Sequence, residues 1–599
     1  MFKKNPIKGI IIQQSLPLYN LITSIMTNIN VKEYASFIWA VADTLRGDYK
    51  QADYGKIILP LIVLRRMDCV LKNTKERVLN TYQTLTSKDL QDADIVLNKI
   101  AGYKFHNHSK YDFDKLISDS SNIAANLRNY INGFSGNAKE ILENFDFDKE
   151  ITKLDKADLL YQIVKQFQEI DLDPSKVSNL EMGYIFEELI RKFAEASNET
   201  AGEHFTPREV IRLMVNLLFI NDDAVLTKEG IIKSVYDPAC GTGGMLSVSQ
   251  EYLKELNQDA RLELFGQEIN PESYAICKSD MLIKGQNPDN IKFGDTLRND
   301  QIKAGRFDYM LSNPPFGVNW QKAQKEVKDE YDNLGFAGRF GAGLPSISDG
   351  SMLFLQHMIS KMKQDGKGSR IGIIFNGSPL FTGDAGSGPS NIRKWIIEND
   401  MLEAIVALPE QLFYNTGIAT YIWIVTNKKE SKREGKVQLI NAVNAFTSMR
   451  KNLGDKRNEI SDEQIDEIVK IYGEYKEGKK CKLFDNDDFG YRRITVERPL
   501  KDDKGNVVKD SNGNPKPDTK LRDTENVPLK EDIYEYFERE VKPHVPDAWI
   551  DEEKTKIGYE INMNRYFYEY KPLRSLEEIT KDILELEKES EGLLEEILK

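Results

Sequence analysis

Helical periodicity dominates the first third of the chain. Residues 31–45 place apolar side chains at spacings of three and four, the pattern of an amphipathic helix. Residues 57–67 are apolar on nearly all sides, with Pro60 close to their start, and predict a buried helix. We therefore expect an all-α domain over residues 31–190, preceded by a loosely ordered leader over residues 1–30.

Beyond residue 190, short apolar runs alternate with helical patterns, which indicates βαβ units in a parallel sheet. In such sheets a ligand lies at the carboxyl ends of the strands. We expect this α/β domain to span residues 191–430. The strand-like runs cover residues 234–236, 262–268, a run that ends in Gly294 and Asp295, and residues 307–312, 371–376, 402–408 and 419–425.

Two polar stretches interrupt or follow this pattern. The Gly-rich residues 319–350 predict a mobile loop over the ligand site. Residues 431–574 form a C-terminal extension, and turn signals near residues 501–526 predict an exposed insertion within it.

Residues 575–599 predict a long C-terminal helix with a heptad seam. Its start carries a capping-box sequence, Ser575 to Glu578. Such a seam favours a partner helix in another subunit, while packing back onto the same chain explains the periodicity equally well. The seam positions are Ile579, Ile583, Leu586, Ser590, Leu593 and Ile597.

Composition narrows the class of protein. The 599 residues include 82 Lys and Arg against 95 Asp and Glu, a formal net charge of -13. A DNA-binding protein with this balance must confine its positive charge to a patch or borrow it from a partner. The 4 cysteines lack metal-ligand spacing, and no apolar run reaches the roughly 20 residues of a membrane span. We expect a cytoplasmic protein with no metal site and no membrane contact.

A glycine-rich turn follows the first strand-like run. Asp237, Gly241, Thr242 and Gly243 lie between that run and a predicted helix, so a ligand can approach the backbone at a helix amino terminus. The turn lacks the Gly-Lys-Ser/Thr ending of a phosphate-binding loop, which disfavours nucleotide hydrolysis. Alone, such a turn is weak evidence for a ligand.

Acidic residues end the next two runs. Glu268 is placed to accept hydrogen bonds from a ribose diol, as in dinucleotide-binding folds. Asp295 is placed to accept one from an adenine amino group. With the glycine-rich turn they predict a pocket for an adenosine-containing ligand.

The fourth run leads into Asn313, Pro314, Pro315 and Phe316. The Asn313 carboxamide oxygen and the Pro314 carbonyl offer two acceptors for one amino group, and Phe316 offers a face on which a base can stack. A proline-stiffened loop explains these four residues equally well when they are taken alone. Their place after the turn and the two acidic residues favours chemistry on an amine.

A charged loop precedes the sheet at residues 203–208. Thr206 is a plausible helix N-cap with Pro207 at the first helical position. Capping does not explain the apolar Phe205 in this loop.

In this order, these segments resemble the motifs of DNA adenine N6-methyltransferases that use S-adenosylmethionine. More narrowly, residues 31–599 resemble the modification (M) subunit of bacterial type I restriction-modification systems. Residues 383–388, 412–417 and 557–562 look like later signatures of that family.

The resemblance implies an N-terminal all-α domain, a Rossmann-like class I methyltransferase domain, and an extension that ends in the heptad helix. It implies methylation of the N6 amino group of adenine, rotated out of double-stranded DNA, with Asn313, Pro314, Pro315 and Phe316 as catalytic residues. The residues implied to bind the cofactor are Glu203, His204, Phe205, Thr206, Pro207, Arg208, Asp237, Gly241, Thr242, Gly243, Glu268 and Asp295.

The resemblance also implies partners. Two M subunits would assemble with one specificity (S) subunit that reads the DNA sequence, and a restriction (R) subunit would join the full complex. Two alternatives are a methyltransferase acting on a protein glutamine and a non-catalytic subunit that serves as a scaffold or DNA clamp. Phe316 in place of tyrosine and the large helical domain argue against the first, and the intact Asn313–Phe316 quartet argues against the second.

Overall fold

The computed structural model describes residues 34, 37, 40–85, 93–197, 206–222, 226–228, 230–315, 317–366, 368–414, 416–568 and 575–597. The contacts divide the chain into two units, Met1–Ile561 and Asn562–Lys599. The expected leader lies outside the described residues, as do four residues expected in the site. These four are Glu203, His204, Phe205 and Phe316.

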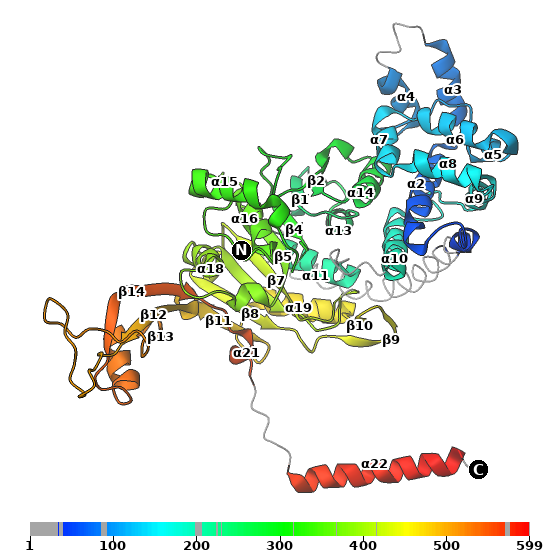
Figure 1. Cartoon of the computed structure of the whole chain (residues 1–599). Coiled ribbons are helices and arrows are strands. Elements are labelled where there is room, and N and C mark those ends of the chain that lie inside the picture. Colours follow the sequence, from blue (N-terminus) through cyan, green and yellow to red (C-terminus); the bar gives the residue numbers. More distant parts are fainter. Residues whose placement is uncertain are drawn as a thin grey trace, which may run out of the picture. The chain divides into compact units, whose positions relative to one another are not determined.

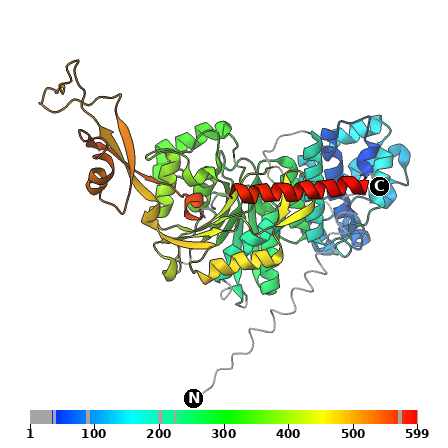
Figure 2. The same ribbon diagram turned by 90° about the horizontal axis from the view of Figure 1, so that it is seen from below.

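The first part of the larger unit is helical, as the apolar periodicity predicts (Figures 1 and 2, blue to cyan). Helix α2 (Gly55–Leu71) is buried along nearly its whole length, with Pro60 in its first half. Such all-round burial matches its apolar sequence. The other helices are α3 (Lys75–Thr84), α4 (Ala93–Ala101), α5 (Phe113–Leu116), α6 (Ile123–Asn132), α7 (Gly136–Asn144), α8 (Phe147–Lys156), α9 (Leu160–Gln168) and α10 (Asn179–Ser197).

A 9-stranded sheet follows, in the order β11-β8-β6-β7-β5-β4-β1-β2-β3. From β3 to β5 all neighbouring strands are parallel. The strands are β1 (Ile232–Asp237), β2 (Arg261–Glu268), β3 (Ile291–Phe293), β4 (Tyr309–Ser312), β5 (Arg370–Asn376), β6 (Leu402–Ala407), β7 (Thr420–Thr426), β8 (Lys436–Asn441) and β11 (Cys481–Asp485).

The expectation of a parallel sheet is wrong at β7, and β11, which lies beyond the expected strand runs, is also antiparallel to its neighbour. Strand β7 runs antiparallel to both β5 and β6, and β11 runs antiparallel to β8. The connection between β6 and β7 contains no helix, and a parallel crossover usually needs one. The result is a mixed sheet in which β7 is inserted between two strands that precede it in the chain.

Helices cover the sheet and join it to the helical part. One apolar cluster holds α11, α13, α14 and α19 against the strands. Ala275, Ile276 and Leu282 of α14 belong instead to the core of the helical part, and Lys278 of α14 forms an ion pair of 2.7 Å with Glu140 of α7. These helices, with those elsewhere on the sheet, are α11 (Arg208–Phe219), α13 (Gly244–Leu256), α14 (Pro271–Ile283), α16 (Ser351–Ser360), α17 (Ser378–Phe381), α18 (Gly388–Glu398) and α19 (Asp462–Glu474).

The loop expected over residues 319–350 is instead a folded insertion. It contains helix α15 (Gln324–Leu334) and a small apolar core with Trp320, Val327 and Phe340. The helix was missed because its apolar positions, Val327, Tyr331 and Leu334, are sparse among charged residues, and Val327 is the one of them that is buried.

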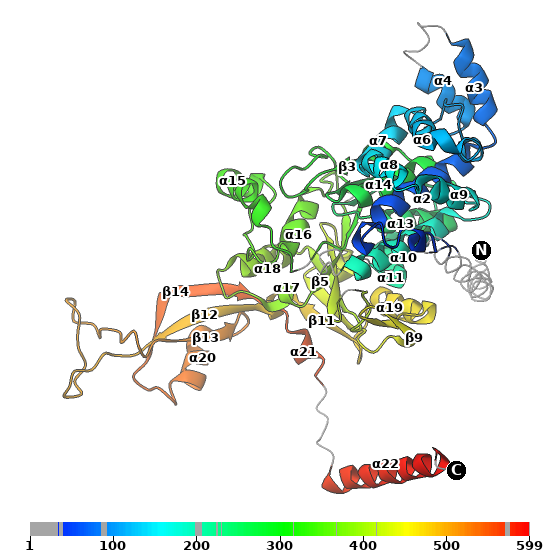
Figure 3. The ribbon, with the colours of Figure 1, turned by 45° about the vertical axis from the view of Figure 1, so that its right-hand side comes forward.

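The extension adds a three-stranded antiparallel sheet of β12 (Gly490–Glu497), β13 (Asp523–Pro528) and β14 (Trp549–Tyr559), shown at the left of Figure 3. Helix α20 (Ile533–Tyr536) packs against this sheet. A separate hairpin, β9 (Thr447–Leu453) and β10 (Lys456–Glu459), bonds instead to the backbone of Gln411 and Tyr414. Residues 499–517 form exposed paired turns, so the expected insertion lies between β12 and β13, and its last residues belong to β13.

The second unit contains α21 (Met563–Tyr566) and the long helix α22 (Leu576–Ile597). The capping box is formed, since the Ser575 N–H donates to Glu578 and the Glu578 N–H donates to the Ser575 hydroxyl, at 3.1 and 3.2 Å. Of the seam, Ile583 and Leu586 are 56% and 64% exposed within this unit.

Candidate active site

The sheet changes direction between β1 and β4. From β1 the strand order proceeds through β2 to β3 on one side, while β4 and β5 lie on the other. The carboxyl ends of β1 and β4 therefore flank a topological switch point, where open α/β sheets bind their ligands. A cavity of about 460 Å³ opens there, a size suited to a small organic ligand. We call it the switch-point cavity.

Most of the described residues expected in the site line this cavity. The lining includes Thr206, Asp237, Gly241, Thr242, Glu268, Asp295, Asn313 and Pro315. Pro207, Arg208, Gly243 and Pro314 are not among its lining residues. The sequence analysis missed Glu187, Ile269, Leu297 and Trp320, which also line it. Ile269 and Leu297 lie within two residues of the predicted Glu268 and Asp295, whereas Glu187 and Trp320 reach the cavity through tertiary packing, which leaves no local sequence signal.

The glycine-rich turn depends on left-handed backbone geometry. Gly241 has φ +52° and Gly243 has φ +86°, and α13 begins at Gly244. A Cβ on Gly243 would lie 2.8 Å from Cys277 Sγ, whereas one on Gly241 would meet nothing within 4 Å. Gly243 is therefore required for helix packing as well as for the turn.

Glu268 ties the end of β2 to this turn. Its Oε2 accepts a hydrogen bond of 2.7 Å from the Gly241 N–H, and its Oε1 accepts one of 2.7 Å from the Asn270 N–H. The carboxylate is thereby held beside the cavity in one orientation. Carboxylate oxygens accept more than one hydrogen bond, so this placement is compatible with a ribose diol.

Asp237, at the end of β1, is 2% exposed. Burial raises its pKa from 3.8 to about 7, although the Ala239 N–H and the Ser312 hydroxyl, both at 3.0 Å, stabilise the charged form. The nearby Glu268 charge adds to the rise. Asp237 therefore titrates near neutral pH.

The loop after β3 is braced by the folded insertion. Asp295 accepts hydrogen bonds from the N–H groups of Leu297 and Arg298, at 2.9 and 3.3 Å. Arg339 of the insertion donates to the carbonyl oxygens of Thr296 and Leu297, at 2.8 and 2.9 Å. Arg339 is itself paired with Glu330 at 2.7 Å. The insertion thus fixes the wall that carries Asp295.

Asn313 connects the end of β4 to the loop before α11. Its Nδ2 donates to Thr206 Oγ1 at 2.9 Å. Val318 and Trp320 line the cavity just beyond, with the indole N–H of Trp320 bonded to the Ser346 carbonyl at 2.8 Å. The Asn313 amide and these apolar side chains therefore line the same cavity.

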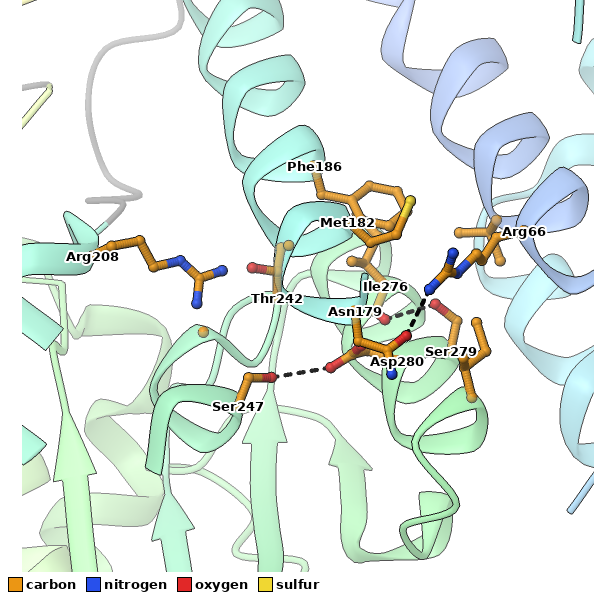
Figure 4. A pocket seen from close by; sticks show the side chains of 14 residues that line it. Arg66, Asn179, Met182, Phe186, Arg208, Thr242, Ser247, Ile276, Ser279 and Asp280 are labelled. Carbon is orange, nitrogen blue, oxygen red and sulfur yellow. Dashed lines mark hydrogen bonds between the residues drawn. The ribbon is translucent and has the colours of Figure 1, made fainter. Parts of the chain in front are cut away.

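Arg208 is not among the residues that line the switch-point cavity. It forms an ion pair of 2.7 Å with Glu187 of α10 and lies over the Tyr184 ring, 4.9 Å from its centroid. It lines a second, smaller cavity between α10, α13 and α14 (Figure 4). Of the loop expected to cover the ligand, Thr206 is the described residue that reaches the switch-point cavity.

Within the described ranges, no group of three or more His, Cys, Asp or Glu residues is arranged to hold a metal ion. Nor does any helix among these residues have the length and apolar character needed to cross a membrane.

The fold and the cavity together define an α/β protein of the methyltransferase-like class, preceded by a helical domain. The chain belongs to the N-6 DNA methylase family, whose model matches residues 178–491, just over half of its length. A second model, the HsdM N-terminal domain, matches residues 34–167.

Individual proteins are also similar. The chain is 28% identical over 468 residues to the MjaIX methylase subunit, a type I restriction enzyme subunit of Methanocaldococcus jannaschii, covering 75% of this chain and 78% of that protein. It is 31% identical over 360 residues to the MjaVII methylase subunit of the same organism, covering 59% of this chain and 57% of that protein. The crystal structure of a type I methyltransferase subunit from Streptococcus thermophilus has the same fold, with TM-score 0.61, 23% identity, and coverage of 77% of this chain and 97% of that one.

Proposed function

We propose that this chain is the methylase subunit of a type I restriction-modification enzyme and methylates N6 of adenine in double-stranded DNA with S-adenosylmethionine. The observation that carries the proposal is that Asn313, Glu268 and the glycine-rich turn, from three different strand ends, line one cavity. The family membership and the type I methylase relatives support the reaction class.

The residues of the cavity fit the cofactor. Glu268 would bind the ribose hydroxyls, and Asp295 would accept a hydrogen bond from the adenine amino group; both residues line the cavity. The amino terminus of α13, behind Gly241 and Gly243, suits the methionine carboxylate. When bound, the cofactor supplies an electrophilic methyl group on its sulfonium sulfur.

The target adenine leaves the duplex and enters the cavity beside Asn313, at a cost of a few kcal/mol. Asn313 Oδ1 and the Pro314 carbonyl would accept the two N6 hydrogens and so free the nitrogen lone pair for attack. They would also stabilise the positive charge on N6 while the N–C bond forms and the sulfonium C–S bond breaks, which leaves S-adenosylhomocysteine as a neutral thioether. N6 then loses one of its two protons to solvent and is neutral again. Phe316 lies outside the described residues, and the resemblance implies for it the role of stacking on the adenine ring.

The partners follow from the same proposal. The chain works with an S subunit that selects the DNA sequence, with a second copy of itself, and with an R subunit in the complete enzyme. The exposed apolar residues of α22, Ile583 and Leu586, support a helical contact with the S subunit. The net charge of -13 also favours a partner, because an acidic chain repels DNA unless another subunit supplies a positively charged DNA-binding surface.

The test is transfer of labelled methyl groups from S-adenosylmethionine to DNA that lacks adenine methylation, with and without the co-encoded S subunit. N6-methyladenine that appears with the S subunit supports the proposal. Label on protein glutamine would favour the alternative substrate. Cofactor binding without any transfer, even with the S subunit, would favour a non-catalytic scaffold.

A further inference from the structure

Glu187 lies in the wall that separates two cavities. Glu187 lines the switch-point cavity, its partner Arg208 lines the smaller cavity, and Thr242 and Gly244 line both. Figure 4 shows Arg208 extending toward Thr242. Glu187 is therefore placed between a fixed cation and the space proposed for the cofactor.

The sequence of α10 produces this placement. Met182, Phe186 and Leu189 follow helical spacing and pack in the core of the helical domain. Gly183 and Glu187, four residues apart, share a different face of the helix. A Cβ on Gly183 would lie 2.5 Å from Arg208 Nη2, so the glycine leaves the space that the guanidinium fills.

The ion pair is specific in its geometry. Arg208 Nε lies 3.1 Å from Glu187 Oε2, and Arg208 Nη2 lies 2.7 Å from Oε1, a two-point contact that fixes the carboxylate plane. The Glu187 and Arg208 side chains are 14% and 9% exposed. Arg208 Nη1 has no hydrogen-bond partner among the described residues. Among the same residues, Glu187 is the carboxylate with which Arg208 forms an ion pair.

We propose that Glu187 binds the α-ammonium group of the cofactor's methionine moiety and that Arg208 positions the Glu187 carboxylate for this contact. The inference rests on the proposed function and adds a cofactor ligand from the helical domain. It extends the site beyond the strand ends of the sheet.

The position of the methionine moiety follows from the other contacts. Glu268 and Asp295, which line the cavity, are the residues proposed to hold the ribose and adenine. This assignment leaves the part of the cavity beside the start of α13 for the amino-acid moiety. Glu187 Oε1 lies 3.3 Å from the position of a Cβ on Gly244, the first residue of that helix. The helix amino terminus favours the methionine carboxylate, and a neighbouring carboxylate suits the ammonium group.

The other acidic groups of the cavity wall are engaged elsewhere. Asp237 accepts hydrogen bonds from Ala239 and Ser312, and Asp295 accepts them from the loop that follows it. Glu268 is held by the Gly241 and Asn270 backbone at the end of β2. Of these four acidic residues that line the cavity, Glu187 is the one whose carboxylate is paired with an arginine, Arg208.

The experiment compares two ligands that differ in the amino-acid part. S-adenosylhomocysteine carries the ammonium and carboxylate groups, whereas 5′-methylthioadenosine lacks both. In the full-length chain, Glu187→Gln should weaken binding of S-adenosylhomocysteine by about 10- to 100-fold, the effect of one charge-assisted hydrogen bond. Binding of 5′-methylthioadenosine should stay within about twofold of wild type, because its contacts do not reach Glu187.

Two more variants complete the test. Glu187→Asp keeps the charge but shortens the reach, and should give a smaller loss confined to S-adenosylhomocysteine. Glu188→Gln, one residue away and absent from the cavity lining, should bind both ligands like wild type. If Glu187→Gln weakens both ligands equally or neither, the inference is overturned. If the wild-type chain binds neither ligand, the proposed function itself is refuted, and the inference with it.

Discussion

The Asn313 side-chain amide and the Thr206 hydroxyl lie 2.9 Å apart, with the amide donating. The bond joins the end of β4 to the loop before α11, 107 residues away in sequence. A carboxamide that donates through Nδ2 presents Oδ1 on its opposite side. Thr206 therefore sets the orientation of the group proposed to accept the N6 hydrogen of adenine.

Thr206→Val should lower the rate of methyl transfer by about 10-fold, since it removes one hydrogen bond at nearly constant volume. Thr206→Ser, which keeps the hydroxyl, should retain most of the rate. Single-turnover methylation with saturating cofactor measures the effect separately from cofactor affinity. A valine variant with the wild-type rate would mean that the orientation of Asn313 does not depend on Thr206.

Asn313→Ala should lower methyl transfer by at least about 100-fold, because it removes an acceptor that acts where charge develops in the transition state. Cofactor binding should change little, since Glu268, Asp295 and the glycine-rich turn remain. The measurement is the single-turnover rate together with the dissociation constant of S-adenosylhomocysteine. Full methylation by this variant would remove the catalytic assignment.

The sequence predicts this site where the chemistry is local. Asp237 and Glu268 end β1 and β2, Asp295 and Asn313 follow the ends of β3 and β4 within two residues, and the carboxyl ends of parallel strands meet at one edge of the sheet. Their convergence follows from the topology alone. Glu187 could not be found in this way, because it lies on a helix of the preceding domain and reaches the cavity only through tertiary packing.

Elements of the fold, like residues of the site, were predicted where the sequence signal is local and missed where tertiary packing determines them. The apolar runs in the sequence of the strands and of α2 are dense enough to predict these elements. The sequence of α15 has few apolar residues, and the helix packs through a small number of contacts such as those of Val327. Strand β7 is antiparallel because the connection before it has no crossover helix. An apolar run predicts that a strand forms, but it does not indicate the direction of that strand in the sheet. Arg208 was assigned to the cofactor by its motif, yet its guanidinium pairs with a residue distant from that motif.

The two glycines of the turn should respond differently to alanine. Gly243→Ala combines a strained φ of +86° with a contact of 2.8 Å to Cys277 Sγ, and should cost about 2–4 kcal/mol of stability. Gly241→Ala meets no atom within 4 Å and should cost about 1 kcal/mol for its backbone alone. Urea denaturation of both variants checks the ranking. Equal losses would show that the Cys277 contact relaxes freely.

Asp237 should make stability depend on pH. Its pKa is raised from 3.8 to about 7 in the fold, so its contribution is fully present below about pH 4 and is lost as the pH rises to 7. Asp237→Asn keeps an acceptor for Ala239 and Ser312 but does not titrate. The melting temperature of wild type relative to this variant should therefore fall between pH 5 and 7 and level off above about pH 7.5. A difference that is constant from pH 5 to 8.5 would place the Asp237 pKa outside this range.

The seam of α22 gives a prediction about assembly. Ile583 and Leu586 are exposed within their own unit, and a buried partner contact would not tolerate a charge at either position. Ile583→Asp or Leu586→Asp should weaken S-subunit binding by more than about 10-fold, measured by co-purification and by titration of the purified subunits. Lys581→Asp introduces the same residue off the seam and is the matched control. All three variants should bind S-adenosylhomocysteine like wild type, because the switch-point cavity is formed entirely within residues 1–561. S-subunit binding that survives both seam substitutions would assign the contact to another surface and leave the heptad pattern to packing against the chain's own residues.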